Sequence, residues 1–319
     1  MHKALWIPII IGGVLGTAVV VGGTLFGVSA IMNAAIPKKI ETHDLGLVTP
    51  LQSFKFALTT SDVAFKVAED GNARIECRES EKVYHTVENS GGTLAITQVN
   101  KKSWIENLAD FGYDYRVTVY LPAGIYNAMD FQCTTGNLSI PEGFVFSSMK
   151  AKSTTGNLSL SCGVLGEAEL KNTTGNILVD KMSPSSLNAS VSTGNITLKN
   201  GTVGGALKTS SSTGNTRLEN MEADSFDAHA STGNITFPHS VCSGLLKAET
   251  STGNVRFDEA DCDTMKVKTS TGNVTGVLLS PKIFYATTST GKVNVPHSTE
   301  GGLAEISTST GNITITIKE

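Results

Sequence analysis

The chain has 319 residues and a formal net charge of −4, with 6% aromatic and 17% charged residues. A protein that binds nucleic acid needs a basic face, which this balance does not supply, so no nucleic-acid partner is expected. Five cysteines are too few for a fold held together by disulfides. The 32 glycines, together with abundant Ser and Thr, favour stacked β-structure over a helical core.

The N-terminal segment differs in kind from the rest. Residues 5–36 carry no charged side chain, and this length exceeds the roughly 20 residues that a membrane-spanning helix needs. The alternative is a cleaved signal peptide, because Val28-Ser29-Ala30 resembles a cleavage site, but the apolar core of a signal is usually only ~7–15 residues long. We therefore expect residues 1–37 to form one uncleaved transmembrane helix, with the following chain outside the cell.

Lysines flank the apolar segment on both sides, with Lys3 before it and Lys38 and Lys39 after it. The positive-inside rule is nearly balanced, so these charges do not decide the orientation, and the placement outside the cell does not follow from them. Four glycines share one face of the expected helix and fit a helix–helix contact through which the chain would self-associate. Glycine is also common in membrane helices that make no such contact. The four are Gly12, Gly16, Gly23 and Gly27.

The second half of the chain repeats the triplet Thr-Gly-Asn ten times at spacings of 19 or 20 residues. The Asn is replaced only once, by Lys292. Regular periods of this order are typical of solenoids and related arrays. The residues of this predicted structural site are Thr135, Gly136, Asn137, Gly156, Asn157, Gly175, Asn176, Gly194, Asn195, Gly214, Asn215, Gly233, Asn234, Gly253, Asn254, Gly272, Asn273, Gly291, Gly311 and Asn312.

Apolar and polar residues alternate on both sides of each glycine. The apolar positions lie seven and five residues before the glycine and two and four residues after it, as Leu187, Ala189, Ile196 and Leu198 do around Gly194. A period of two on each side indicates two strands, each with one buried face. Each repeat is therefore expected to be a strand, a Thr-Gly-Asn corner, a second strand and a loop.

Two architectures fit this unit. Gly-Asn is a turn signal, so the chain could be an antiparallel meander of hairpins. Identical residues at every corner favour a parallel β-solenoid instead, because equivalent residues then lie about 4.8 Å apart and can bond in columns. The prediction is an all-β protein with a β-solenoid of about ten coils over residues 131–319. An irregular β-region or β-cap is expected over residues 38–130.

The repeated residues have predicted structural roles. Glycine supplies a backbone conformation that a Cβ would oppose, and a column of Asn can satisfy its own amides and the backbone of the corner. Lys292 is expected to interrupt this column at one coil. The strand at residues 313–318 is expected to end the rod uncovered. End-to-end association, a partner strand, or protection by Lys318 and Glu319 alone all remain open at that end.

The segment at residues 101–115 holds the densest aromatic cluster outside the apolar N-terminus. Its members are Trp104, Phe111, Tyr113 and Tyr115. We interpret the cluster as a hydrophobic plug over the end of the first coil. A loop that contacts a ligand is the alternative interpretation.

No catalytic or cofactor motif is recognisable, and the six histidines show no metal-ligand spacing. We therefore expect neither an enzyme nor a cofactor. Cys242 and Cys262 both lie nine residues after a repeat glycine, so they should lie opposite each other on adjacent coils. A disulfide and two small buried thiols both remain open for this pair.

The run Val117-Thr118-Val119-Tyr120-Leu121-Pro122, followed by Thr135-Gly136-Asn137-Leu138-Ser139-Ile140, resembles the entry into the repeats of a known bacterial family. That family comprises adhesin-type proteins with β-strand repeats, of unknown function. The resemblance extends over residues 45–319. It implies a right-handed β-solenoid held at a bacterial envelope and carries over no catalytic residue.

The leading hypothesis is a non-enzymatic, membrane-anchored scaffold of the cell envelope that contacts a surface, glycan or protein. A polysaccharide-acting enzyme on a solenoid is the second hypothesis, and it predicts acidic and basic residues clustered on one sheet. A cell-wall-binding repeat module is the third, but it needs aromatic cages, and no Trp follows Gly136. Ice binding would need a second regular rank of Thr, which Leu178, Arg217 and Arg256 interrupt.

Overall fold

The computed structural model of the protein describes residues 39–45, 51–108 and 114–319. The expected transmembrane helix at residues 1–37, with its four glycines, lies outside these residues. Within the described ranges, no helix is long and apolar enough to cross a membrane. These residues form 25 β-strands and one short helix, α2 (Trp104–Leu108).

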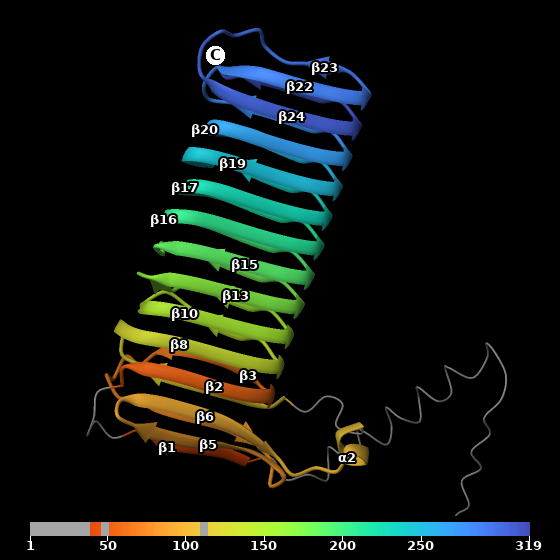
Figure 1. Cartoon of the computed structure of the whole chain (residues 1–319). Helices are drawn as coiled ribbons and strands as arrows, with labels where there is room; N and C mark the ends of the chain where they lie inside the picture. The colour runs from red at the N-terminus through yellow and green to blue at the C-terminus, as the bar shows by residue number, and fades with distance from the viewer. Residues whose placement is uncertain (1–38, 46–50, 109–113) are drawn as a thin grey trace, which may run out of the picture.

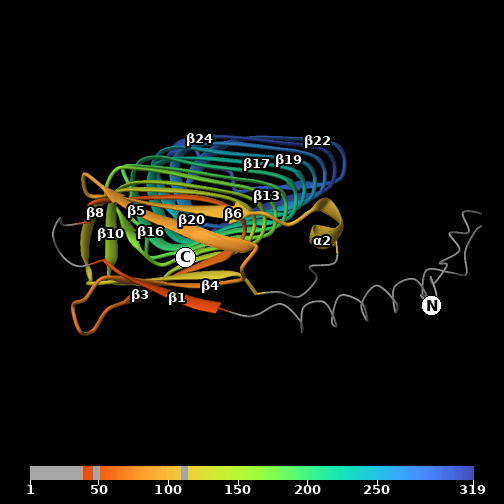
Figure 2. The same ribbon diagram turned by 90° about the horizontal axis from the view of Figure 1, so that it is seen from below.

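The strands build a rod of stacked coils (Figure 1). Each coil has one strand before its corner and one after it, and equivalent strands of neighbouring coils pair in parallel. Residues at equivalent repeat positions therefore lie side by side, as Leu187 and Leu207 do. This pairing confirms the β-solenoid, and the meander of hairpins is wrong for the repeat region. Seen from below, the coils follow one another as flattened loops (Figure 2).

The strands that precede the corners form what we call the long-strand sheet. Its spatial order is β5 (Val83–Ser90), β6 (Thr93–Asn100), β2 (Ser53–Thr60), β8 (Gly124–Thr135), β10 (Phe144–Thr155), β13 (Glu167–Thr174), β15 (Ser186–Thr193), β16 (Ile196–Thr213), β17 (Thr216–Thr232), β19 (Val241–Thr252), β20 (Val255–Thr271), β24 (Gly302–Thr310) and β22 (Lys282–Thr290).

The strands that follow the corners form the short-strand sheet, and β16, β17 and β20 continue through both sheets. Its order is β1 (Lys39–Asp44), β4 (Arg74–Glu79), β7 (Arg116–Leu121), β3 (Asp62–Val67), β9 (Leu138–Ile140), β11 (Leu158–Leu160), β14 (Ile177–Asp180), β16, β17, β18 (Ile235–Pro238), β20, β21 (Val274–Leu278), β25 (Ile313–Ile317) and β23 (Val293–Asn294). The short strand β12 (Gly163–Val164) pairs with β10 between the two sheets.

The core is the space between the two sheets. Leu187, Ala189, Ile196 and Leu198 are at most 1% exposed, so the apolar positions around Gly194 point inward as the alternation predicts. Aromatic rings are most numerous in the first coils, where Phe54 and Phe146 meet edge to face with centroids 6.1 Å apart. Such rings contribute large apolar areas to the core, which also contains aliphatic side chains, alanine and methionine along the rod.

The order of the coils along the rod departs from the order in the chain at the C-terminal end. Strand β24 pairs with β20, where Ala304 faces Met265, and with β22 on its other side, where Ala304 faces Phe284. Figure 1 shows β24 between these two strands. The last strand, β25, is likewise covered by β21 and β23. The expectation that residues 313–318 end the rod is therefore wrong, since the rod ends on β22 and β23.

At the N-terminal end, too, the coils are stacked in an order that differs from their order in the chain. The coil formed by β2 and β3 lies between the coil of β6 and β7 and the coil of β8 and β9. Beyond it, β1, β4 and β5 pair antiparallel with their neighbours and form a cap. Strand β8 runs through residues 130 and 131, so the cap and the repeats share one continuous sheet.

Candidate binding surface

The repeat corners lie in a column along one edge of the rod, and Asn side chains connect them as a ladder. At each step the backbone N–H of one Asn donates to the Oδ1 of the Asn one coil earlier, as Asn215 does to Asn195 at 2.9 Å and Asn234 to Asn215 at 2.9 Å. At several steps the side-chain amide donates to the same oxygen, as in Asn234 Nδ2 to Asn215 Oδ1 at 3.1 Å. All of these bonds run in one direction along the rod, because the acceptor always belongs to the neighbouring corner on the side of the N-terminal cap.

The two ends of the ladder carry residues other than Asn. Its first acceptor is Asp62, whose Oδ1 receives the N–H of Asn137 at 2.8 Å. Its last donor is the N–H of Lys292, which reaches Asn312 Oδ1 at 2.9 Å. Lysine has no acceptor atom, so no further corner can bond to it. Lys292 therefore ends the ladder and does not interrupt it, which corrects the sequence-based expectation.

The corner glycines are required by close approach as well as by backbone conformation. Their φ angles range from +128° at Gly175 to +157° at Gly136, a region that side chains with a Cβ rarely adopt. A Cβ built on Gly214 would lie 1.9 Å from the carbonyl oxygen of Gly194. Glycine in the repeat triplet thus allows the backbones of successive corners to lie in direct contact.

A second polar column lies on the inner side of the corners. The residue three places before each glycine points inward, and at most coils its side chain donates to the carbonyl of the preceding corner glycine. Thr250 Oγ1 reaches Gly233 O at 3.0 Å, and Thr269 Oγ1 reaches Gly253 O at 3.1 Å. The sequence-based prediction gave this position no role. The recurrence of Ser and Thr there was the signal for a buried acceptor.

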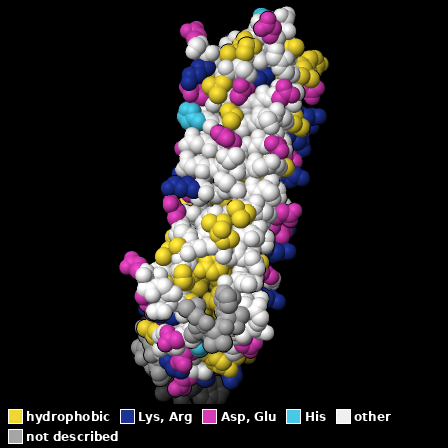
Figure 3. Space-filling view, turned by 90° about the vertical axis from the view of Figure 1, so that its left-hand side faces the viewer, with side chains coloured by type: hydrophobic (Ala, Val, Ile, Leu, Met, Phe, Trp, Pro, Cys, Tyr) yellow, Lys and Arg dark blue, Asp and Glu magenta, His cyan; other side chains and the backbone are white. Residues whose placement is uncertain are grey.

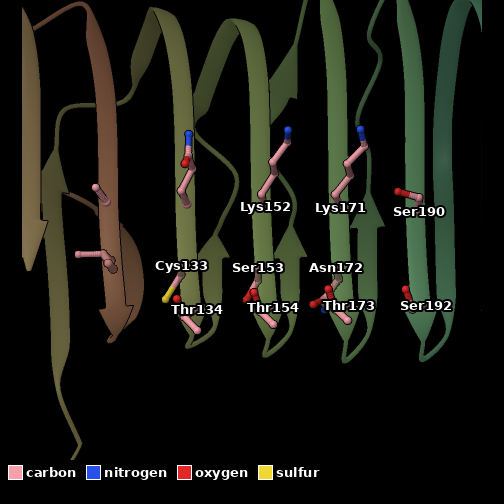
Figure 4. Close-up of a pocket in the computed structure, with 13 residues that line it drawn as sticks. Cys133, Thr134, Lys152, Ser153, Thr154, Lys171, Asn172, Thr173, Ser190 and Ser192 are labelled. Carbon is pink, nitrogen blue, oxygen red and sulfur yellow. The ribbon is translucent and has the colours of Figure 1, made fainter. Parts of the chain in front are cut away.

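The long-strand sheet is hollowed beside the corners of β8, β10, β13 and β15 (Figure 4). The hollow has a volume of about 610 Å³. Two rows of outward side chains line it, and they come from neighbouring strands. The row nearer the corners consists of Thr134, Thr154, Thr173 and Ser192, and the other row consists of Gln132, Lys152, Lys171 and Ser190.

Two like charges face each other in this hollow. Lys152 and Lys171 are direct cross-strand partners, and like charges in that position are destabilising. Glu169 offsets part of this repulsion, since it contacts Lys171 and lies 4.0 Å from Lys152 and 3.2 Å from Lys150. The hydrogen bond from Lys171 is the main cause that lowers the pKa of Glu169. The two ammonium groups border a polar, hydroxyl-rich hollow.

The structure brings Cys242 and Cys262 together as register partners on β19 and β20. Both are buried free thiols, and they line a second hollow of about 400 Å³. The closeness of the two thiols and the burial of Cys262 raise the pKa of Cys262.

A buried polar group in the cap was missed by sequence analysis. Ser61 Oγ lies 2.9 Å from His85 Nε2, and His85 Nδ1 lies 3.3 Å from Glu79 Oε2. This order of groups resembles a nucleophile, a base and its orienting acid. The three residues are only 2%, 4% and 5% exposed, so no substrate reaches the serine in this structure. The histidine is the only one of the six in such an arrangement among the described residues.

The aromatic segment at residues 101–115 divides into buried and exposed parts. Tyr115 is buried, and its hydroxyl accepts from Lys102 Nζ at 2.8 Å, whereas Trp104 on α2 is 73% exposed. Phe111 and Tyr113 lie outside the described residues. Tyr115 thus fits the predicted plug and Trp104 does not. Elsewhere, apolar side chains on the edge shown in Figure 3 form separate patches, with charged groups between them.

Stacked parallel coils, a corner ladder and a capped end define a β-solenoid of the repeat type. The family model of Toastrack DUF4097 matches residues 52–211, 127–244 and 184–319, and the chain belongs to this family. This match confirms the predicted relation to a family of β-strand repeat proteins of unknown function.

Two solved structures illustrate what this chain is similar to. A "putative lipid binding protein" from Parabacteroides distasonis ATCC 8503 is 15% identical with a TM-score of 0.47, covering 87% of this chain and 97% of its own. A "putative adhesin" from Bacteroides fragilis NCTC 9343 is 14% identical with a TM-score of 0.42, over the same shares. No curated protein matches this chain.

Proposed function

We propose that the protein is a non-enzymatic, membrane-anchored component of a bacterial cell envelope whose rod binds an acidic glycan. The binding surface in this proposal is the hollow on the long-strand sheet beside Lys152 and Lys171. The anchor in this proposal is inferred from the sequence, and the binding surface is taken from the structure of the long-strand sheet.

The observation that carries the proposal is the like-charged pair Lys152 and Lys171. Most charges on this sheet have opposite-charged partners on the next strand, such as Lys55 and Asp130 or Lys150 and Glu169. An anionic ligand would relieve the repulsion between the two ammonium groups. The flanking hydroxyl groups can both donate and accept hydrogen bonds, as sugar recognition needs.

The non-enzymatic part rests on the accessibility of reactive groups. Among the described residues, Ser61 and His85 come nearest to a nucleophile and its base, and both are almost completely buried. Lysines and hydroxyl groups line the hollow, and the nearby carboxylate of Glu169 is paired with Lys171. The anchor rests on the uncharged residues 5–36, which are long enough to span a bilayer.

Binding of the purified full-length chain in detergent to immobilised uronate- or phosphate-containing glycans tests the proposal, with the matched uncharged glycans as reference. Replacement of both lysines (K152A/K171A) should weaken binding at least about tenfold, which is about 1.4 kcal/mol. Added salt should weaken binding by the wild type. Equal binding of charged and uncharged glycans, or cleavage of the glycan, would contradict the proposal.

The chain offers a matched control on the same sheet. Lys247 and Lys266 are also like-charged cross-strand partners, and Lys247 also has carboxylate neighbours, but neither lines the hollow. The variant K247A/K266A should bind the acidic glycan as the wild type does. An equal loss in both double variants would show that total charge, not the hollow, governs binding.

Protease treatment of intact cells tests the location. Digestion of residues 39–319 from outside is the expected result, with a cytoplasmic protein as the control for lysis. Complete protection of the rod on intact cells, followed by digestion after lysis, would refute its placement outside the cell.

A further inference from the structure

The cap contains three side chains of metal-ligand type that lie together although they come from different strands. Cys77 and Glu79 are two residues apart on β4 and share its inner face, and His85 enters from β5. Their ligand atoms all lie within 4.8 Å of one another. The residues are 0%, 5% and 4% exposed, so the group is closed to bulk water.

The histidine is oriented as a ligand would be. Its Nε2 lies 2.9 Å from the hydroxyl of Ser61, and its Nδ1 faces Glu79 at 3.3 Å. If Nε2 carries the hydrogen and donates it to Ser61, the lone pair of Nδ1 points into the group. Metal-binding histidines commonly have their second ring nitrogen held by such a partner. The backbone N–H of His85 also fixes Glu79, donating to Oε2 at 2.9 Å.

A fourth candidate ligand lies on the edge strand of the cap. His43 on β1 faces Ile75, and the next inward residue of β4 is Cys77, which faces Glu41. His43 and Cys77 are thus diagonal neighbours on one face, within reach of long side chains. The Nε2 of His43 is buried and makes no hydrogen bond. A buried nitrogen without a partner is costly, and coordination to a metal ion would satisfy it.

We propose that Cys77, Glu79 and His85, with His43 as the fourth ligand, bind a divalent transition-metal ion of the zinc class. A thiolate, an imidazole and a carboxylate together suit Zn²⁺, and closed tetrahedral sites of this kind are structural. On binding, the Cys77 thiol gives up its proton to solvent and the sulfur forms the metal bond. The ion also offsets the cost of burying the Glu79 carboxylate.

The site would fasten the cap to the rod. Its ligands belong to β1, β4 and β5, the three antiparallel strands that close the N-terminal end. Ser61, which orients His85, belongs to the corner between β2 and β3 in the first complete coil. Terminal caps keep the end of a repeat array from fraying, so metal binding should stabilise that end.

Titration of the metal-free full-length chain with Co²⁺ tests the site directly. We expect about one ion per chain, with the intense visible bands of a tetrahedral site and a thiolate-to-cobalt charge-transfer band, both displaced by Zn²⁺. Zinc should also raise the melting temperature of the metal-free chain. A wild-type chain that shows no thiolate band and no zinc-dependent shift would overturn the proposal.

Variants assign the ligands. C77S should abolish the charge-transfer band, and S61A should weaken the affinity for cobalt about 10- to 100-fold. C242S/C262S is the matched control, because it removes the other neighbouring thiols, and its spectrum should equal that of the wild type. Loss of the band in this control but not in C77S would overturn the assignment.

A fluorophosphonate probe separates the metal site from the rival interpretation. The metal-free chain should remain unlabelled because Ser61 serves to orient His85. Covalent labelling of Ser61 would overturn the proposal and indicate an esterase-type nucleophile instead. Circular dichroism of every variant shows whether the solenoid is intact, and the wild-type titration decides the proposal even if a variant does not fold.

Discussion

Substitution of Gly214 by alanine is the sharpest test of the corner. This glycine lies near the middle of the rod, where neither end can relax to absorb a change. Its φ angle is +141°, and a Cβ would lie 1.9 Å from the carbonyl oxygen and 2.6 Å from the carbonyl carbon of Gly194. Both atoms belong to backbone, so no side-chain rotation can make room.

The expected cost has two parts. A residue with a Cβ held in this region of φ is strained by roughly 1–3 kcal/mol. Relief of the contact requires the two corners to separate, which weakens the bonds that join them. These include Gly194 N–H to Thr213 O at 2.9 Å and Asn215 N–H to Asn195 Oδ1 at 2.9 Å. At about 1 kcal/mol for each such bond, the substitution should destabilise the rod by roughly 3–5 kcal/mol in all.

Gly204 provides the control, because a Cβ there would have its nearest neighbour at 3.7 Å. Urea unfolding followed by circular dichroism compares G214A and G204A with the wild type. Hydrogen exchange at residues 194–216 then shows whether the loss is local, as expected in an array whose coils contact only their neighbours. If G214A is destabilised by no more than G204A, close approach of the backbones is not what requires glycine at the corner.

Two further predictions concern register. The two cysteines of K268C/S307C should cross-link readily, since these residues are partners on β20 and β24. The two cysteines of K268C/T287C should not cross-link. Efficient cross-linking of this second pair would show that the coils stack in the order of the chain, with β22 beside β20. Oxidation of Cys242 and Cys262 should form a disulfide that closes a loop of about 20 residues and stabilises the chain by up to about 3 kcal/mol. Comparison of reduced and oxidised chains in urea measures this gain, and thiols that resist mild oxidation would contradict the geometry.

The two ends of the rod are built differently. Strands β1, β4 and β5 close one end with antiparallel pairing, while the other end stops at Lys292, which lacks an acceptor. The ladder itself begins at the acceptor Asp62 and ends at the donor Lys292. Among the described residues β22 pairs with β24 on one side only, and its Tyr285 is 68% exposed.

The coil itself could be derived from the sequence. Period-two alternation around each glycine determines which residues are buried, and identical corners require parallel stacking because only neighbouring coils can then share a ladder. The positive φ of glycine and the Asn column follow from the same local chemistry. These features depend on residues close together in the chain or on exact repetition, and both can be read without a structure.

The order of the end coils and the polar group in the cap were decided by tertiary structure. Nothing local states whether β22 or β24 stacks on β20, because both carry the same apolar pattern; the replacement of Asn by Lys292 was the available clue that its coil must be last. Glu79 and His85 lie on strands of different sheets, and Ser61 reaches His85 only because two coils exchange places. Local sequence specifies the structure of each coil. The stacking order of similar coils depends on long-range contacts, because it is decided by which coil can lie at an end of the rod.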